Sequence, residues 1–358
     1  MKVITKYIVK EVIKVFIMCQ FIFILLYLVI DFIQKIDNFV KAGVPFSSTI
    51  AYFLYKIPLI TDQMIPVATT ISVIVVICLM KKNREIMAMK ACGLDIFRTF
   101  TPAIFISIIL SVFSFILSDA IIPFTSSRQN EIWNAEVKKR DPSGLSGSTN
   151  IWYKSDNNIY WIEYFDAKSQ TMKGPVFYFF NDQFILVKKI KGETGRRVNN
   201  RWEIEKAKVQ TLAGENDYRF ERLDQVSIDI PETPEMFIKK IKKPEDMSYG
   251  QLKRHAQKVR AEGYDNTADM VNLYRKLAFP FITAVLALIA IPVGLWEKIN
   301  GIPLSITIGI AACFLLYLIM GFARAIGLAG VLPPFLSAWT ANILFSLAGI
   351  NLIIYIKK

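Results

Sequence analysis

The apolar residues of the chain gather in six long stretches that carry few or no charged side chains. These stretches lie at about 12–33 and 57–80, and at Thr99–Ser118, Leu277–Trp296, Ile302–Ala323 and Val331–Ile356. A helix of roughly 20 apolar residues crosses the ~30 Å hydrocarbon core of a bilayer. The pattern therefore predicts six membrane-spanning helices, and the first carries no small-residue cleavage site of a signal peptide.

Between the third and fourth stretches, the pattern changes to short aromatic and β-branched runs separated by polar turns. Residues 151–165 hold two such runs around Asp-Asn-Asn, which is typical of a β-hairpin, and later runs are separated by turns such as Gly-Glu-Thr-Gly. Short strands at this spacing predict a sandwich or a jelly roll. The predicted fold is an α-helical membrane protein with six transmembrane helices and an inserted all-β, jelly-roll-like domain.

Four segments follow from these patterns. Residues 1–123 are predicted to hold the first three membrane helices, with a short cytoplasmic helix at about 83–93. Residues 124–246 are predicted to form the β domain, 247–273 a helical connector, and 274–358 the last three membrane helices.

The loop before the third stretch, KKNREIMAMKACGLDIFR, has the signals of a short helix. We expect Asn83 to cap this helix, Gly93 to end it in a left-handed conformation, and Asp95 to cap the membrane helix that follows. Glu85 and Met89 are four residues apart and so share one face.

The net charge of +13 is concentrated beside the apolar stretches, which indicates contact with anionic lipid headgroups and not with nucleic acid. Lys and Arg are more frequent in the short segments on the N-terminal side of the predicted membrane than on the opposite side. The positive-inside rule then places both termini in the cytoplasm and the β domain outside.

Catalytic and metal-binding motifs are missing from the sequence. His255 is the only histidine, the four cysteines lie in or beside the apolar stretches without metal-ligand spacing, and there is no G-x-x-x-x-G-K-[ST] nucleotide loop. We therefore expect no enzyme activity, no cofactor, no metal and no disulfide in the β domain. Any ATP that drives this protein is expected to be hydrolysed by a separate chain.

Several local motifs occur in a recognisable order. They are Asp37 with Lys41-Ala-Gly, Arg84-Glu85 with Met89 and Ala-Cys-Gly, the aromatic hairpin after residue 150, MSYGQLKRHAQKVRAEG, and Pro333-Pro334. Together with the three-plus-three helix arrangement, they resemble the lipopolysaccharide export system permease family (LptF/LptG), and the LptG-type subunit more closely. The resemblance covers essentially the whole chain and depends on order and spacing.

The resemblance implies a transmembrane permease subunit of an ATP-driven ABC exporter in the inner membrane. Such a subunit extracts lipopolysaccharide and passes it to periplasmic jelly-roll bridge proteins. Its other partners are a second homologous six-helix permease and a dimeric cytoplasmic ABC ATPase. The resemblance also implies that Arg84, Glu85 and Met89 couple the permease to this ATPase.

A protein that extracts an anionic glycolipid needs apolar walls and cations at the outer rim. Lys35, Lys41 and Arg324 are the predicted lipopolysaccharide-binding residues. Lys41 matches a family position, Lys35 is displaced by one residue, and Arg324 has no family counterpart. An arginine that snorkels toward the headgroups or faces a partner helix is the alternative for Arg324.

Two other functions remain open on the sequence alone. One is a permease of another lipid or lipoprotein ABC pathway, although such permeases usually insert a large outer domain after helix one. The other is a non-transporting membrane anchor for a periplasmic β domain, which needs neither six helices nor a coupling helix.

Overall fold

A computed structural model describes residues 2–138, 148–155, 158–166, 169–181, 183–198, 201–213, 218–230, 244–261, 265–296 and 301–357. The chain divides into two compact units. The helical unit comprises Met1–Ile132 and Lys242–Lys358, and the β unit comprises Trp133–Ile241.

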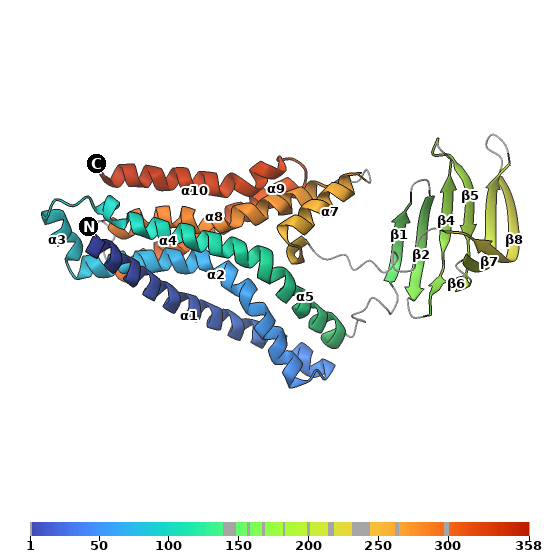
Figure 1. Ribbon diagram of the computed structural model, residues 1–358, viewed down its shortest axis with the longest axis horizontal. Coiled ribbons are helices and arrows are strands. Elements are labelled where there is room, and N and C mark those ends of the chain that lie inside the picture. Colours follow the sequence, from blue (N-terminus) through green and yellow to red (C-terminus); the bar gives the residue numbers. More distant parts are fainter. Residues whose placement is uncertain are drawn as a thin grey trace. The chain divides into compact units, whose positions relative to one another are not determined.

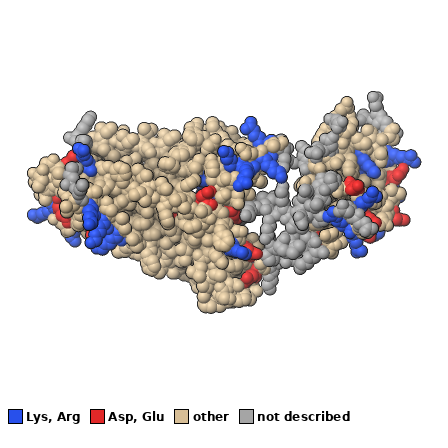
Figure 2. Space-filling view, in the orientation of Figure 1, with Lys and Arg blue, Asp and Glu red and all other residues tan. Residues whose placement is uncertain are grey.

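The helical unit contains six helices that are long and apolar enough to cross a membrane, counted over the described residues. This confirms the predicted six spans. Long helices run side by side through the unit (Figure 1), and the middle of the face shown in Figure 2 carries almost no charged side chains. The helices are α1 (Lys2–Ala42), α2 (Phe46–Lys82), α4 (Ile96–Ile116), α8 (Thr267–Leu295), α9 (Ile302–Leu328) and α10 (Pro334–Lys357).

The third span continues well beyond α4. It passes through a π-helical turn, η1 (Leu117–Ile121), then α5 (Ile122–Ile132) and a second π-helical turn, η2 (Trp133–Val137). The helical segment thus ends at Val137, whereas the sequence pattern placed the start of the β domain at residue 124. The connector after the β unit consists of η3 (Pro244–Asp246) and α7 (Tyr249–Ala261).

Helices α2 and α8 form the centre of the helical unit. In the most apolar 18-residue stretch of each of these two helices, 72% is buried inside the protein. The corresponding share is 17% for α1 and 22% for α9 and α10. Residues of α1, α4, α9 and α10 pack on this centre in one continuous apolar core. The outer helices expose many large apolar side chains, as expected of surfaces that face lipid.

The loop between α2 and α4 forms the short helix α3 (Glu85–Ala91). Gly93 ends this segment with a φ of +75°, and the Asp95 carboxylate accepts a hydrogen bond from the Arg98 amide at 3.2 Å, so both predictions are confirmed. The predicted Asn83 cap is wrong, because α2 extends to Lys82 and Arg84 occupies the N-cap position. The Asn83 side chain instead donates to Glu85 Oε1 at 3.2 Å.

The β unit is an antiparallel sheet, as the sequence predicted. Its strands are β1 (Ser148–Lys154), β2 (Asn158–Asp166), β3 (Thr171–Lys173), β4 (Val176–Phe180), β5 (Leu186–Lys191), β6 (Thr194–Val198), β7 (Arg201–Leu212) and β8 (Tyr218–Ile228). Successive segments of the chain pair with one another in a meander (Figure 1). Both β3 and β4 pair with β2, and both β5 and β6 pair with β7.

The strands are interrupted in the middle of this sheet, at residues 174–175 between β3 and β4 and at residues 192–193 between β5 and β6. Gly174 has a φ of +59°, and its amide donates to the Glu193 carbonyl at 2.9 Å. The Glu193 amide in turn donates to the Glu205 carbonyl at 3.1 Å. Gly-Glu-Thr-Gly was predicted as a turn, but the chain does not reverse there, since β5 and β6 both run antiparallel to β7. A side chain at Gly192 would collide with Ile204, because its Cβ would lie 2.1 Å from Ile204 Cγ2.

The β unit has its own apolar core, which includes the fully buried side chains of Tyr160, Phe165, Phe177 and Trp202. All four cysteines of the chain lie outside this unit. We therefore expect residues 133–241, expressed alone, to give a β-type circular dichroism spectrum that a reducing agent does not change. A mainly helical spectrum, or loss of structure on reduction, would contradict the independence of this unit.

Candidate functional site: a buried cation cluster beside an apolar groove

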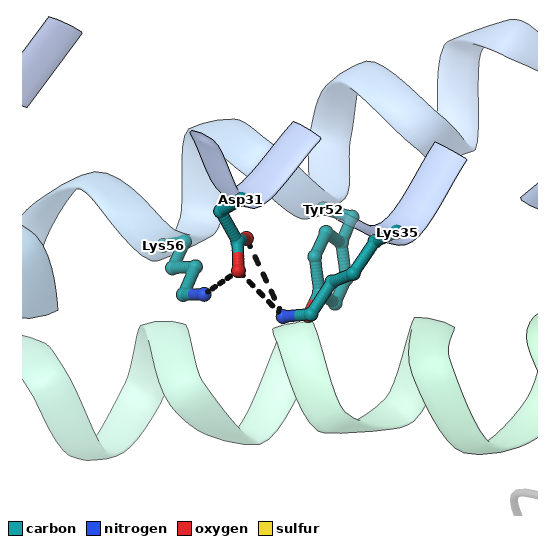
Figure 3. A network of polar contacts seen from close by, with 4 residues as sticks. All are labelled: Asp31, Lys35, Tyr52 and Lys56. Atoms are coloured by element: carbon teal, nitrogen blue, oxygen red, sulfur yellow. Dashed lines mark hydrogen bonds and ion pairs between the residues drawn. The ribbon is translucent and has the colours of Figure 1, made fainter. Parts of the chain in front are cut away.

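Four polar side chains meet between α1 and α2, near the end of α1 that lies away from the chain termini. Asp31 and Lys35 are one helical turn apart on α1, and Tyr52 and Lys56 are one turn apart on α2. The i, i+4 spacing brings each pair to one face of its helix. Figure 3 shows the two pairs facing each other, with the Asp31 carboxylate between the two ammonium groups.

The contacts within this cluster are short. Asp31 Oδ1 lies 2.7 Å from Lys56 Nζ and 3.0 Å from Lys35 Nζ, and Lys35 Nζ also donates to the Tyr52 hydroxyl at 2.8 Å. Aromatic rings complete the surroundings. Lys56 Nζ lies 5.2 Å from the centre of the Tyr27 ring, and Lys35 Nζ lies 5.2 Å from the centre of the Tyr52 ring. Cation–π contacts of this length add to the stabilisation of the ammonium groups.

Burial makes this cluster energetically expensive. Asp31 is 7% exposed and Lys56 is 6% exposed. Moving an ion out of water costs several kcal/mol even after the protein relaxes, so buried charges occur where partners compensate them. Charged residues inside membrane segments usually mark substrate or ion pathways.

The cluster contains two ammonium groups and one carboxylate, so it carries an excess positive charge. The Lys35 side chain is 25% exposed and is the most accessible charged group of the three. An anionic oxygen from outside can therefore approach Lys35, and a partly desolvated setting strengthens its attraction compared with open water.

An apolar groove of about 410 Å³ lies on the same stretches of α1 and α2. Its walls are almost entirely carbon and include Leu28, Phe32, Phe46, Phe53 and Ile57. Phe53 also contacts the ring of Tyr52, with the ring centres 5.2 Å apart. None of the four cluster residues lines the groove, but Phe32 and Phe53 in its wall directly follow Asp31 and Tyr52 along the chain. An apolar groove and an excess positive charge on the same two helices are together suited to a molecule that carries both acyl chains and phosphates.

The structure does not bring the three predicted cargo-binding residues together. Lys35 belongs to the cluster, whereas Lys41 is exposed in the last turn of α1, about 9 Å further along the helix axis. Arg324 lies on α9, where its Nη2 donates to Asn272 Oδ1 at 3.1 Å in a different cavity.

The predicted coupling residues occupy different environments in and beside α3. Arg84 is exposed and has a φ of 62°. Glu85 is half-buried, and its Oε1 accepts a hydrogen bond from the Tyr7 hydroxyl at 3.4 Å. Met89 is buried in the core and holds α3 against the membrane helices. Met87, 69% exposed, is the methionine of α3 that is available to a partner.

Asp31, Tyr52 and Lys56 are the members of the cluster that sequence reasoning did not assign to the site. Two signals could have indicated them. Asp31 and Lys35 form an i, i+4 ion pair at the end of an apolar helix, and Lys56 lies four residues after Tyr52, just before another apolar stretch. Nothing in the sequence, however, specifies that these two pairs face each other. Over the described residues, no group of His, Cys, Asp or Glu could hold a metal ion.

Six membrane helices with a β unit inserted after the third define a multi-pass membrane protein. The model of the lipopolysaccharide export system permease LptF/LptG family matches residues 6–355. This chain therefore belongs to that family and is a permease component of lipopolysaccharide export. Comparison with individual curated proteins gives no significant match.

Proposed function

We propose that this chain is one transmembrane subunit of an ATP-driven exporter that extracts lipopolysaccharide from the inner membrane. The observation that carries the proposal is the Asp31–Lys35–Lys56 cluster beside the α1–α2 groove. The ammonium groups are suited to the phosphates of the cargo, and the groove is suited to an acyl chain. In this proposal both termini are cytoplasmic, and the β unit is periplasmic and passes cargo to jelly-roll bridge proteins.

The proposed energy source is a dimeric ATPase that binds the exposed side of α3. Arg84, Met87 and Lys90 are exposed there, with Glu85 at the edge of this surface. The buried Ile86 and Met89 fix α3 to the bundle, so a force on the exposed side reaches the membrane helices.

Co-purification from native membrane tests this assembly. We expect a small P-loop ATPase and a second six-helix permease to accompany the chain. Recovery of the chain alone, or with a soluble partner on the β unit and no ATPase, would favour the non-transporting anchor. Recovery of an ATPase with a lipoprotein in place of lipopolysaccharide would favour another ABC pathway.

Lys41 is proposed as a further contact for the anionic head of the cargo. We expect Lys41→Ala and Lys41→Glu to reduce photo-crosslinking of lipopolysaccharide while membrane insertion and ATPase binding stay normal. The lysine also suits the negative end of the α1 dipole, which contributes about 0.3–1 kcal/mol and does not depend on cargo. A photoreactive residue at position 41 that never captures lipopolysaccharide in active vesicles would remove Lys41 from the site.

A further inference from the structure

A second apolar groove lies between α1 and α4, and it shares no lining residue with the α1–α2 groove. Its volume is about 780 Å³, which is within the range of roughly 300–1,000 Å³ typical of small-molecule sites. Along α1 it extends from Thr5 to Ile17, and along α4 from Arg98 to Leu110. Both helices begin at the end of the helical unit where the chain termini lie (Figure 1), so the groove also begins there.

The walls of this α1–α4 groove are apolar along most of its length. Ile106 is buried at its base, and the half-buried Val9 and Phe16 pack against the core of the bundle. Phe105 and Ile109, on the α4 side, are 63% and 67% exposed. Large apolar side chains with this exposure face lipid in a membrane helix, so the groove is suited to an apolar chain.

Arg98 is the one charged residue among those that line the groove, and it lies at the end near the chain termini. It belongs to the first turn of α4, where the Asp95 carboxylate accepts a hydrogen bond from the Arg98 backbone amide at 3.2 Å. The Arg98 side chain is exposed and forms no ion pair with any residue that the structure describes. A guanidinium group binds phosphate oxygens in a forked, two-point geometry.

The charges around this end of the groove are mainly positive. Residues 2–14 and 81–98, which include the first turns of α1 and α4, contain nine Lys and Arg but only three Asp and Glu. Each of the three carboxylates already accepts a hydrogen bond or forms an ion pair within the chain. Figure 2 shows Lys and Arg side chains gathered at this end, next to a surface that carries almost no charge. An anionic headgroup is therefore favoured here over a neutral or zwitterionic one.

The length of the groove matches one leaflet of a bilayer. The helical rise from Thr5 to Ile17 is about 18 Å, and half of the hydrocarbon core of a bilayer is about 15 Å. An acyl chain whose headgroup lies at Arg98 can therefore follow the whole apolar part of the groove. An apolar helix of a partner protein would instead cover the Arg98 guanidinium with carbon, which is unfavourable for an unpaired charge.

We propose that the α1–α4 groove binds an anionic phospholipid from the leaflet on the side of the chain termini. The phosphate binds Arg98, and one acyl chain lies along the groove. Cation and apolar walls follow one another in the groove as phosphate and acyl chain do in the lipid. The proposal requires neither lipopolysaccharide nor ATP, so it stands apart from the proposed export function.

Lipid retention by the full-length protein tests the headgroup contact. The protein is placed in nanodiscs of equal parts phosphatidylcholine and phosphatidylglycerol, and native mass spectrometry identifies the lipids that stay bound. We expect phosphatidylglycerol to be enriched. Arg98→Gln should weaken its binding about tenfold or more, the loss expected for a charge-assisted hydrogen bond, and Arg98→Lys should keep part of it. Lys14→Gln is the matched control, because it removes a 73% exposed charge from α1 that does not line the groove.

A second pair of variants tests the apolar part of the groove. Ile109→Trp enlarges a side chain of the groove wall and should lower the retention of phosphatidylglycerol. Ile108→Trp makes the same change at the neighbouring position, which is 45% exposed and does not line the groove, and should retain the lipid as the wild type does. If Arg98→Gln and Ile109→Trp both retain phosphatidylglycerol as well as their controls, the proposal is wrong.

Photo-crosslinking decides the question if one of these variants does not fold. A photoreactive residue at Ile13, on the α1 side of the groove, is introduced into an otherwise wild-type chain. Capture of phosphatidylglycerol in preference to phosphatidylcholine supports the proposal. Equal capture of the two lipids, or capture of a protein segment in native membranes, contradicts it.

Discussion

Replacing Asp31 with asparagine is expected to cause the largest loss of stability of any single change in the α1–α2 cluster. The substitution leaves Lys56, whose side chain is only 8% exposed, without its carboxylate at 2.7 Å. Removing one partner of a buried ion pair typically costs about 3–5 kcal/mol, because the remaining charge is uncompensated. The measurement is the free energy of unfolding in a mild detergent, or the thermal midpoint where unfolding is irreversible.

Two further variants show whether this loss comes from charge. Asp37→Asn removes the same group from an exposed position of α1 and should change stability little. Asp31→Asn combined with Lys56→Met removes both buried charges and should recover most of the lost stability. An Asp31→Asn protein as stable as the wild type would show that the buried ion pair is not a determinant of this fold.

The same cluster separates stability from cargo binding. Lys35 is the more exposed lysine, so Lys35→Gln should affect the fold much less than Asp31→Asn does, yet it should lower the capture of lipopolysaccharide. Loss of capture without loss of stability is the signature that distinguishes a cargo contact from a structural ion pair.

Replacing Glu85 with alanine is expected to uncouple ATP hydrolysis from export, or to release the ATPase, while the chain still folds and inserts. The carboxylate lies at the edge of the exposed side of α3, where an ATPase can offer basic groups. A hydrogen bond to a charged group contributes about 1.5–3 kcal/mol, so ATPase binding should weaken about tenfold or more. Export in vesicles and co-elution of the ATPase measure the effect.

A structural explanation for Glu85 must be separated from this one. Its carboxylate also accepts from Tyr7 and Asn83 within the chain, and an acid in a first helical turn is favourable by about 0.3–1 kcal/mol. Tyr7→Phe removes the first contact and keeps the carboxylate, so it should export nearly as well as the wild type. Wild-type export by a properly inserted Glu85→Ala protein would falsify the coupling role.

The long-range pattern of the chain predicts its architecture well. Membrane helices depend on local apolar length, and each of the six expected spans is found. The run RWEIEKAKVQTL forms strand β7 (Arg201–Leu212), whose buried residues largely alternate with more exposed ones, and this is the local pattern from which a strand can be predicted. The sequence did not predict the three-residue strand β3 or strand β6, because pairing with neighbours and not local composition defines them.

Tertiary contacts override local signals at several positions. Gly192 and Gly195 indicate a turn by composition, but in the structure they make room for Ile204 on the facing strand. Met89 shares a helix face with Glu85, yet packing against the bundle buries it and leaves Met87 exposed. Arg324 is separated from Lys35 because the packing of α9 directs it toward Asn272 on α8, which no spacing in the sequence specifies.

The central claim is that the α1–α2 groove holds the exported glycolipid and that ATP hydrolysis empties it. The most direct measurement places a photoreactive residue at Phe32, in the groove wall, in vesicles that contain this chain, its partner permease and the ATPase. Our account predicts capture of lipopolysaccharide before ATP is added, less capture after ATP and a periplasmic bridge protein are added, and little capture in the Lys35→Gln protein. Capture that ATP and Lys35→Gln leave unchanged, or capture of phospholipid alone, would contradict it.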